Sequence, residues 1–108
     1  MKQQIRIKNQ PKTQRNYVPV SNVTELLDVI QSHGDRTVFR WNVKGGEGTL
    51  TYAQLHEDVT ALSAAQAAAG LRDGARVVII GNTSHMWMEA YLSTLAAHNV
   101  VIPIACIF

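Results

Sequence analysis

The 108-residue sequence has little charge, one cysteine and no long apolar run. Charged residues make up 17% of the chain, and the net charge of +2 is too small to indicate a nucleic-acid-binding surface. The single cysteine, Cys106, excludes an internal disulfide and is compatible with a reducing compartment. No apolar run approaches the ~20 residues that cross a bilayer, and the first residues lack the apolar core of a signal peptide. These absences predict a cytoplasmic protein.

The charge that is present is unevenly distributed along the chain. Before Tyr17 there are five basic residues and no acidic one. They are Lys2, Arg6, Lys8, Lys12 and Arg15. We interpret residues 1–16 as a basic, flexible arm, because so polar a terminus has little to bury; a targeting role or contact with an anionic surface is the alternative. The apolar residues concentrate in 17–108, which is long enough for one small domain with a modest core.

A helix and a hairpin are predicted over the first part of that region. Asn22 followed by Glu25 has the spacing of a helix N-terminal cap, and the helix is placed near 22–32. β-Branched and aromatic residues then predict a strand that turns back through the glycines at 44–48, which gives a hairpin near 37–51. The turn lacks a Gly-Lys-Ser/Thr ending, so we do not interpret it as a phosphate-binding loop.

A second helix is predicted near 52–69, opened by the capping pair Thr51 and Gln54. An apolar stripe at steps of three and four predicts the face that packs on a core. The stripe consists of Tyr52, Leu55, Val59, Leu62, Ala65 and Ala69. The side chains expected largely on the opposite side are Gln54, Glu57, Asp58 and Gln66.

A strand, a helix and a strand follow, near 76–81, 84–98 and 100–104. This order predicts a parallel βαβ unit, and the unbroken apolar strands predict cover on both faces. The helix is apolar around most of its circumference. The exceptions, which we expect to form a solvated polar stripe, are His85, Glu89 and Ser93. The predicted fold class is therefore α/β, as a partial three-layer domain.

The residues offer only isolated candidates for chemistry. His85 and Glu89 share a helix face at a spacing that can hold a metal, but the sequence offers no third ligand nearby. Cys106 has no histidine nearby and is interpreted as a small apolar residue, not a nucleophile. Gly81 at a strand-to-helix junction could face an anion, yet it falls far short of the G-x-G-x-x-G dinucleotide fingerprint. We therefore predict no catalytic, cofactor-binding or metal-binding residue in this chain.

A longer pattern runs through residues 49–104. It reads TLTYAQL at a helix start, GLRDGARVVII at a turn and strand, NTSHMW at the next helix and VVIPI at the last strand. This order resembles the N-terminal region of AMP-forming acyl-CoA synthetases, members of the adenylate-forming superfamily. The segments YVPVSNVTELLDVI and IIGNTSHMWMEAYL resemble most the long-chain fatty-acid-CoA ligase branch. Residues 17–108 are accordingly expected to be an incomplete N-terminal subdomain of an AMP-binding domain.

The resemblance implies a ligase that activates a fatty acid with ATP and then transfers the acyl group to CoA. It also implies that ATP, Mg²⁺ and CoA are bound by motifs downstream of this region, which have no counterpart here, so the fragment alone is expected to be inactive. The full-length enzyme is expected to be cytoplasmic or peripheral to a membrane. The positions that match the family are interpreted as scaffold: Tyr52, Leu55, Gly70, Gly74, Arg76, Val77, Asn82, Trp87 and Pro103. The alternatives are an autonomous α/β interaction or binding module and a nucleotide-binding domain of another kind.

The last helix and strand carry more apolar surface than one sheet can cover. Trp87 and Tyr91, one turn apart, are predicted to pack the helix on the sheet; stacking on a base or an acyl chain is the alternative. The remaining apolar surface is expected to join two copies as a homodimer through 100–108 and one side of the helix. That side consists of Met86, Met88 and Leu92.

Overall fold

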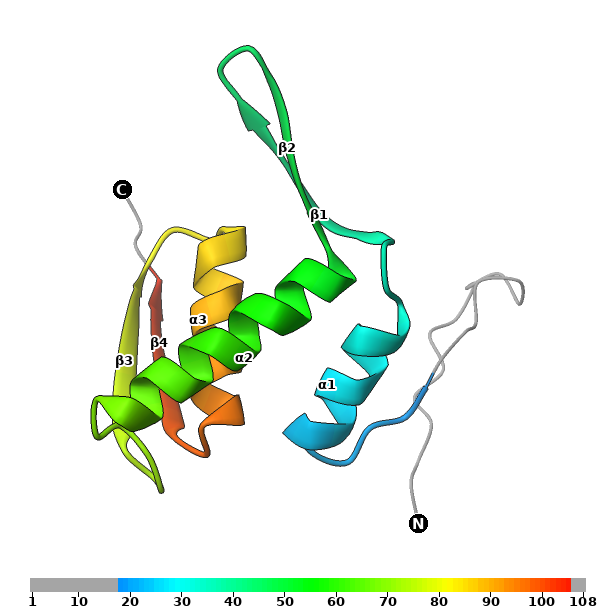
Figure 1. Cartoon of the computed structure of the whole chain (residues 1–108). Coiled ribbons are helices and arrows are strands. Elements are labelled where there is room, and N and C mark those ends of the chain that lie inside the picture. Colours follow the sequence, from blue (N-terminus) through cyan, green and yellow to red (C-terminus); the bar gives the residue numbers. More distant parts are fainter. Residues whose placement is uncertain (1–17, 106–108) are drawn as a thin grey trace, which may run out of the picture.

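Seven helices and strands follow one another in the order predicted from the sequence (Figure 1). The computed structural model describes residues 18–105. The elements are α1 (Val23–Ser32), β1 (Thr37–Val43), β2 (Gly46–Thr51), α2 (Tyr52–Ala68), β3 (Arg76–Gly81), α3 (His85–Ala96) and β4 (Val100–Ala105). The predicted arm at 1–16 and Cys106 lie outside the described residues. No helix within 18–105 has the length and apolar character that a membrane crossing requires.

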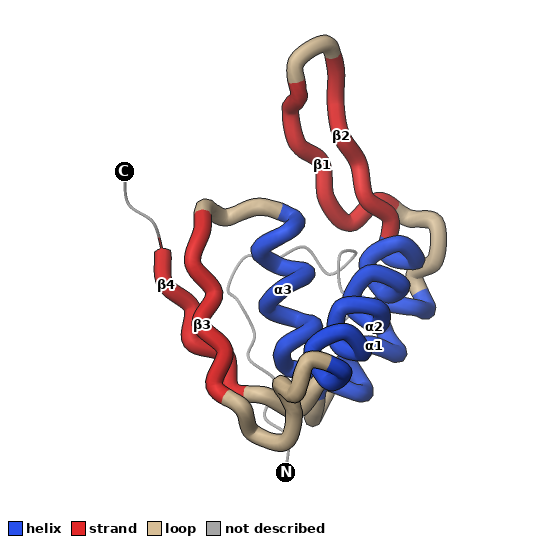
Figure 2. The backbone as a smooth tube through the Cα atoms, turned by 60° about the vertical axis from the view of Figure 1, so that its left-hand side comes forward, coloured by secondary structure: helices blue, strands red, loops and turns tan. Residues whose placement is uncertain are grey.

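The β1–β2 hairpin projects away from the helices (Figures 1 and 2). Its strands pair antiparallel and end with Val43 opposite Gly46. Gly45 closes the turn at a φ of 87°, a left-handed conformation that glycine adopts without steric cost. Gly48 lies so close to the Trp41 indole that any Cβ at this position would overlap the ring. Glycines therefore set both the chain reversal and the packing of the indole.

Helix α2 has defined ends that the sequence predicts. The Thr51 hydroxyl accepts the Gln54 N–H at 3.1 Å, and the Gln54 side chain accepts the Thr51 N–H at 2.9 Å, which is a reciprocal capping box. At the other end Gly70, with a φ of 91°, turns the chain out of the helix. The Leu71 N–H then donates to the Gln66 carbonyl at 2.8 Å, as in a Schellman cap.

The parallel pair β3–β4 and the helices form three layers. The strands pair in register from Arg76 opposite Val100 to Gly81 opposite Ala105, which confirms the predicted parallel unit. Helix α3 contacts both strands on one side and α1 and α2 on the other, so it is the middle layer (Figure 2). The core lies among the helices and the base of the hairpin. Its buried members are Ile30, Leu50, Leu55, Val59 and Leu92.

The outer face of the β3–β4 sheet is exposed within the described part of the chain. The prediction that both strands are covered on both faces is wrong here, because α3 packs on only one side of the sheet. The exposed side chains, with their exposed fractions, are Val78 (50%), Ile80 (65%), Val100 (49%), Ile102 (37%) and Ile104 (44%). The inward-facing Ile79 is only 8% exposed.

Candidate functional site

Two of the three residues in the polar stripe of α3, Glu89 and Ser93, are buried, and His85 is half-buried. Glu89 is 8% exposed, and Ser93 and its neighbour Thr94 have no exposed surface. The prediction of a solvated stripe is wrong because α3 is the middle layer, where this side of the helix faces α2 and not solvent. The interface between α2 and α3 therefore gathers most of the buried polar side chains of the described residues.

The face of α2 differs from its prediction in a matching way. Leu55 and Val59 are buried as expected, but Leu62, farther along the predicted apolar stripe, is 41% exposed. Asp58 and Gln66, predicted on the opposite side, are half-buried. The first turns of α2 pack on the apolar core, whereas its later turns meet the polar side of α3. The neighbour, not the spacing of apolar residues, therefore decides which side of the later turns is covered.

Gln66 connects the end of α2 to α3 and to the start of β4. Its Nε2 donates to Ser93 Oγ and to Thr94 Oγ1, each at 3.1 Å. Asn99 Nδ2 donates to Gln66 Oε1 at 3.3 Å and to the Leu71 carbonyl at 2.8 Å. Buried hydrogen bonds contribute about 1 kcal/mol each and cost more when one partner is removed. The network is therefore a structural link between three elements.

Asp58 and Glu89 bring two carboxyl groups together at the same interface. Burial, the side-chain hydrogen bond to Asp58 and the negative charge of Asp58 raise the pKa of Glu89 to about 7. Two carboxyl groups hydrogen-bond to each other only when one of them carries a proton. The Glu89 carboxyl group therefore keeps its proton to a higher pH than an ordinary glutamate does.

The other residues singled out in the sequence have structural contacts. The His85 imidazole stacks on the Trp41 indole of β1, with ring centroids 3.9 Å apart and an interplanar angle of 12°. The Trp87 and Tyr91 rings lie 5.4 Å apart, and Trp87 Cδ1 is 3.7 Å from the position that a Cβ on Gly81 would occupy. Trp87 therefore packs α3 on the end of β3, as the sequence predicts.

The described residues do not fit a Mg²⁺-nucleotide site. At the start of α3, Ser84 Oγ accepts the Trp87 N–H at 3.1 Å, so this end of the helix is already capped by its own side chain. Glu89 is covered by the α2–α3 interface. No three His, Cys, Asp or Glu side chains between residues 18 and 105 are grouped so that they could hold a metal ion.

These elements define an α/β unit built from a parallel strand pair, its crossover helix, two further helices and a projecting hairpin. The sequence model of the family described as AMP-binding enzyme matches residues 26–106. The chain belongs to this family. The resemblance to the N-terminal region of adenylate-forming enzymes is thereby confirmed.

Solved structures show the same fold. The fatty acid AMP ligase from Legionella pneumophila superposes with a TM-score of 0.69 and 25% identity, over 78% of this chain and 15% of that one. The NpsA N-terminal subdomain from Klebsiella oxytoca superposes with a TM-score of 0.70 and 24% identity, over 80% of this chain and 22% of that one. The latter likeness shows the fold alone.

Among curated proteins, the chain is similar to phenyloxazoline synthase MbtB. It is 42% identical to the Mycobacterium tuberculosis (strain ATCC 25618 / H37Rv) protein over 62 residues, which are 57% of this chain and 4% of that protein. It is 40% identical to the protein from Mycobacterium sp. (strain MCS) over 62 residues, 5% of its length. The chain therefore spans a small part of the curated relatives that it matches.

The sequence analysis missed the carboxyl pair and the Gln66 network. Each contains a polar side chain that the sequence analysis interpreted as exposed to solvent. Glu89 is the one charged residue in a helix predicted to be buried on several sides. Gln66 lies in the alanine-rich part of α2, where small side chains allow a neighbouring element to approach closely. A polar residue in an element predicted to be buried is evidence for a buried polar contact.

Proposed function

We propose that this chain forms part of the N-terminal subdomain of an enzyme that activates a fatty acid as an acyl-adenylate and passes the acyl group to CoA. The observation that supports the substrate class is the likeness to the fatty acid AMP ligase from L. pneumophila. A second structure of that ligase holds acyl adenylate and pyrophosphate. The CoA acceptor rests on the sequence resemblance to the long-chain fatty-acid-CoA ligase branch.

An aromatic carboxylate is the second candidate substrate. It is favoured by the higher identity to phenyloxazoline synthase MbtB, whose name specifies a phenyl-bearing product. Both candidates share the adenylation of a carboxylate, which is the chemistry that we propose with either substrate.

In this proposal the described residues act as scaffold. The capped helix α2, the βαβ unit and the hairpin hold one another in place, while ATP, Mg²⁺ and CoA are bound by residues of the enzyme other than 18–105. We place the enzyme in the cytoplasm, with peripheral membrane contact as its form of access to fatty acids.

Pyrophosphate exchange into ATP tests the proposal. The 108-residue chain alone is expected to give no exchange above a blank and no rise in melting temperature with Mg-ATP, because a ligand stabilises only a folded state that binds it. A longer polypeptide that carries this chain with the rest of an adenylate-forming domain is expected to exchange with fatty acids. Exchange by the chain alone contradicts the scaffold role. Exchange of the longer polypeptide with aromatic acids only would show that the substrate is an aromatic carboxylate and not a fatty acid.

A further inference from the structure

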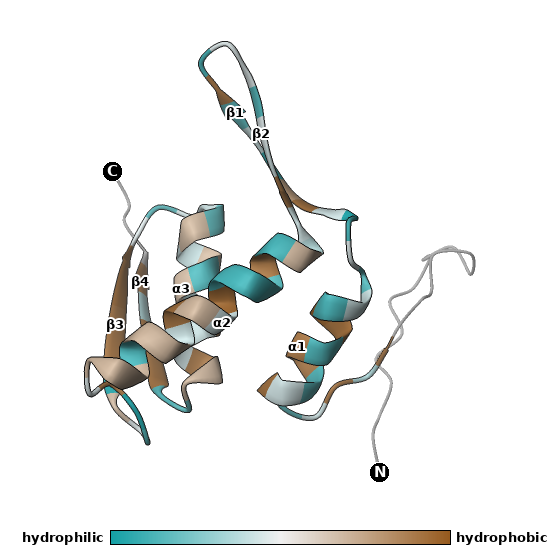
Figure 3. Cartoon of the chain, viewed as in Figure 1, coloured by the Kyte–Doolittle hydropathy of each residue, from teal (hydrophilic) through white to brown (hydrophobic). Residues whose placement is uncertain are grey.

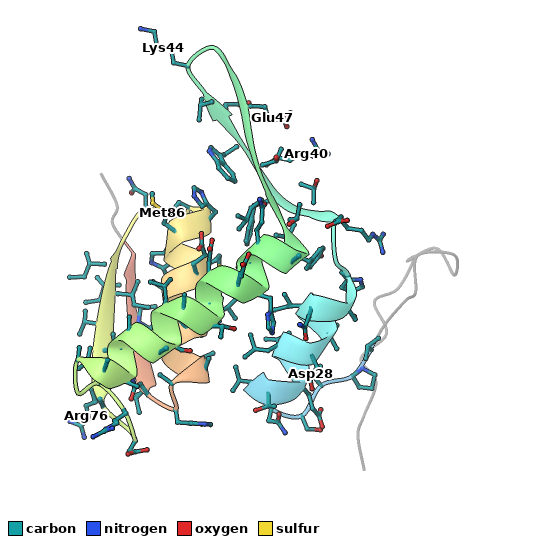
Figure 4. All side chains as sticks on the ribbon, viewed as in Figure 1. Asp28, Arg40, Lys44, Glu47, Arg76 and Met86 are labelled. Atoms are coloured by element: carbon teal, nitrogen blue, oxygen red, sulfur yellow. The ribbon has the colours of Figure 1, made fainter. Side chains whose placement is uncertain are left out.

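The α2–α3 interface contains two carboxyl groups and no cation to neutralise them. Glu89 is buried on α3, and its hydrogen-bond partner Asp58 is half-buried on α2. Neither helix contains a lysine or an arginine. Figure 4 shows Arg40 and Lys44 on the hairpin and Arg76 at the outer end of β3, all away from this interface. Ionisation of both carboxyl groups would therefore leave two negative charges facing each other.

Asp58 is the group among the described residues whose charge and hydrogen bond act on Glu89. His85 lies one turn earlier on α3 and stacks on Trp41. Strand β4 carries no ionisable side chain. The other ionisable side chains of the elements that contact α3, all partly or fully exposed, are Tyr52, His56 and Glu57 on α2, Tyr91 on α3, Glu25 and Asp28 on α1, and Arg76 on β3.

We propose that a proton shared between the Asp58 and Glu89 carboxyl groups holds α2 against α3, so that the packing of these two helices loosens as the pH rises and the proton is lost. With the proton present, one carboxyl O–H donates to the other carboxylate. Without it, the two like charges repel in a poorly hydrated interface, where such repulsion is stronger than in water. This inference does not depend on the proposed substrate.

The direction of the pH dependence follows from the two states of Glu89. In the folded chain its pKa is raised to about 7, whereas the ordinary value for a glutamate is 4.5. The folded state thus retains the proton over an interval in which the unfolded chain has released it. The stabilisation is complete below pH 4.5 and is lost as the pH rises towards and through 7. The Gln66 network has no ionisable member, so it keeps the far end of α2 attached to α3 throughout.

Chemical denaturation between about pH 5 and about pH 8 measures this effect. The unfolding equilibrium constant of the wild-type chain is expected to increase with pH more steeply than that of Glu89→Gln, by on the order of a hundredfold across the interval. The variant keeps all four histidines and every other ionisable side chain, so the difference between the two profiles isolates Glu89. Glu57→Gln, one residue before Asp58 and exposed, is the matched control and is expected to keep the wild-type profile.

NMR titration of the Glu89 carboxyl carbon in the wild-type chain gives a reading that does not require a variant to fold. The expected midpoint is about 7, and Asp58→Asn is expected to lower it without restoring the ordinary value, because burial is the largest cause of the shift. Hydrogen exchange of the backbone amides of α2 gives a second reading. At the alkaline end of the pH range, we expect the amides near Asp58 to exchange faster than those near Gln66, after correction for the intrinsic effect of pH on exchange. A wild-type midpoint near 4.5 overturns the proposal, as does a Glu89→Gln profile parallel to wild type.

Discussion

The two faces of the β3–β4 sheet differ much more in environment than in composition. On the inner face Val77, Ile79 and Val101 are covered or half-covered by the α3 layer, and only the end at Pro103 is exposed among its described side chains. The outer face carries five aliphatic side chains, all exposed in the described part of the chain. Figure 3 shows β3 as hydrophobic along most of its length. Hydrophobicity therefore identifies these strands, but it does not reveal which of their faces has a neighbour.

The α2–α3 interface shows the converse case, in which polar side chains are buried because an element covers them. There the buried side chains include Glu89, Ser93 and Thr94, while Met86 on the same helix is 66% exposed. Polar groups tolerate this burial because each finds a hydrogen-bond partner, and exposed aliphatic groups are common when no layer covers them. Burial in this molecule is set by the order of its layers, with α3 in the middle.

The largest effect is expected from the exposed sheet face. We expect the isolated chain to self-associate at micromolar concentration, because an aliphatic face of this kind recruits another apolar surface. Ile80→Lys places a charge on that face, opposite Ile104, and is expected to give a monomer in sedimentation. Met86→Lys tests the alternative contact on α3. It is a matched change, because the Met86 and Ile80 side chains are each about two-thirds exposed. Leu92, predicted to belong to that contact, is buried in the core and is not available for it.

The two lysine variants distinguish the surfaces. If Met86→Lys alone abolishes association, the helix side is the interface and the contrast between the sheet faces has no consequence for assembly. A wild-type chain that sediments as a monomer and binds no hydrophobic dye contradicts both assignments.

A smaller effect, on stability, is expected from the two leucines of α2. Leu55→Ala removes a side chain that is 2% exposed and belongs to the core, so we expect a loss of about 3 kcal/mol in chemical denaturation. Leu62→Ala makes the same chemical change on the same helix at a side chain that is 41% exposed, and a loss below about 1 kcal/mol is expected. Equal losses would show that the later turns of α2 are covered in solution.

Local signals in the sequence predicted the elements and their ends. Thr51 with Gln54 gave the capping box of α2, and Gly70 gave its end. The helix α3 ends less predictably, because His98 takes a left-handed φ of 60°, a position at which glycine is usual. These features depend on residues adjacent in sequence, and that is why they could be predicted.

The candidate site depends on contacts between distant residues, and the sequence did not predict it. Spacing placed Glu89 and Ser93 on one side of α3 correctly but could not tell that this side faces Asp58 and Gln66. The family motifs were informative for a different reason, because they match the order and spacing of several helices and strands at once. They predicted the fold and the adenylate-forming family, and they carry no information on polar contacts specific to this chain.

The smallest effect is expected where the hairpin meets α3. The sequence alone predicts that His85→Ala changes stability by less than about half a kcal/mol, as for a solvated side chain. The stack of His85 on Trp41 changes that expectation to a loss of about 1 kcal/mol, because paired aromatic rings contribute beyond the area that they bury. A double-mutant cycle of His85→Ala and Trp41→Ala measures the coupling by chemical denaturation. His56→Ala on α2, a ring with no aromatic contact among residues 18–105, is the control. Additive losses in the cycle would show that the hairpin moves independently of α3 and that the stack adds nothing to the fold.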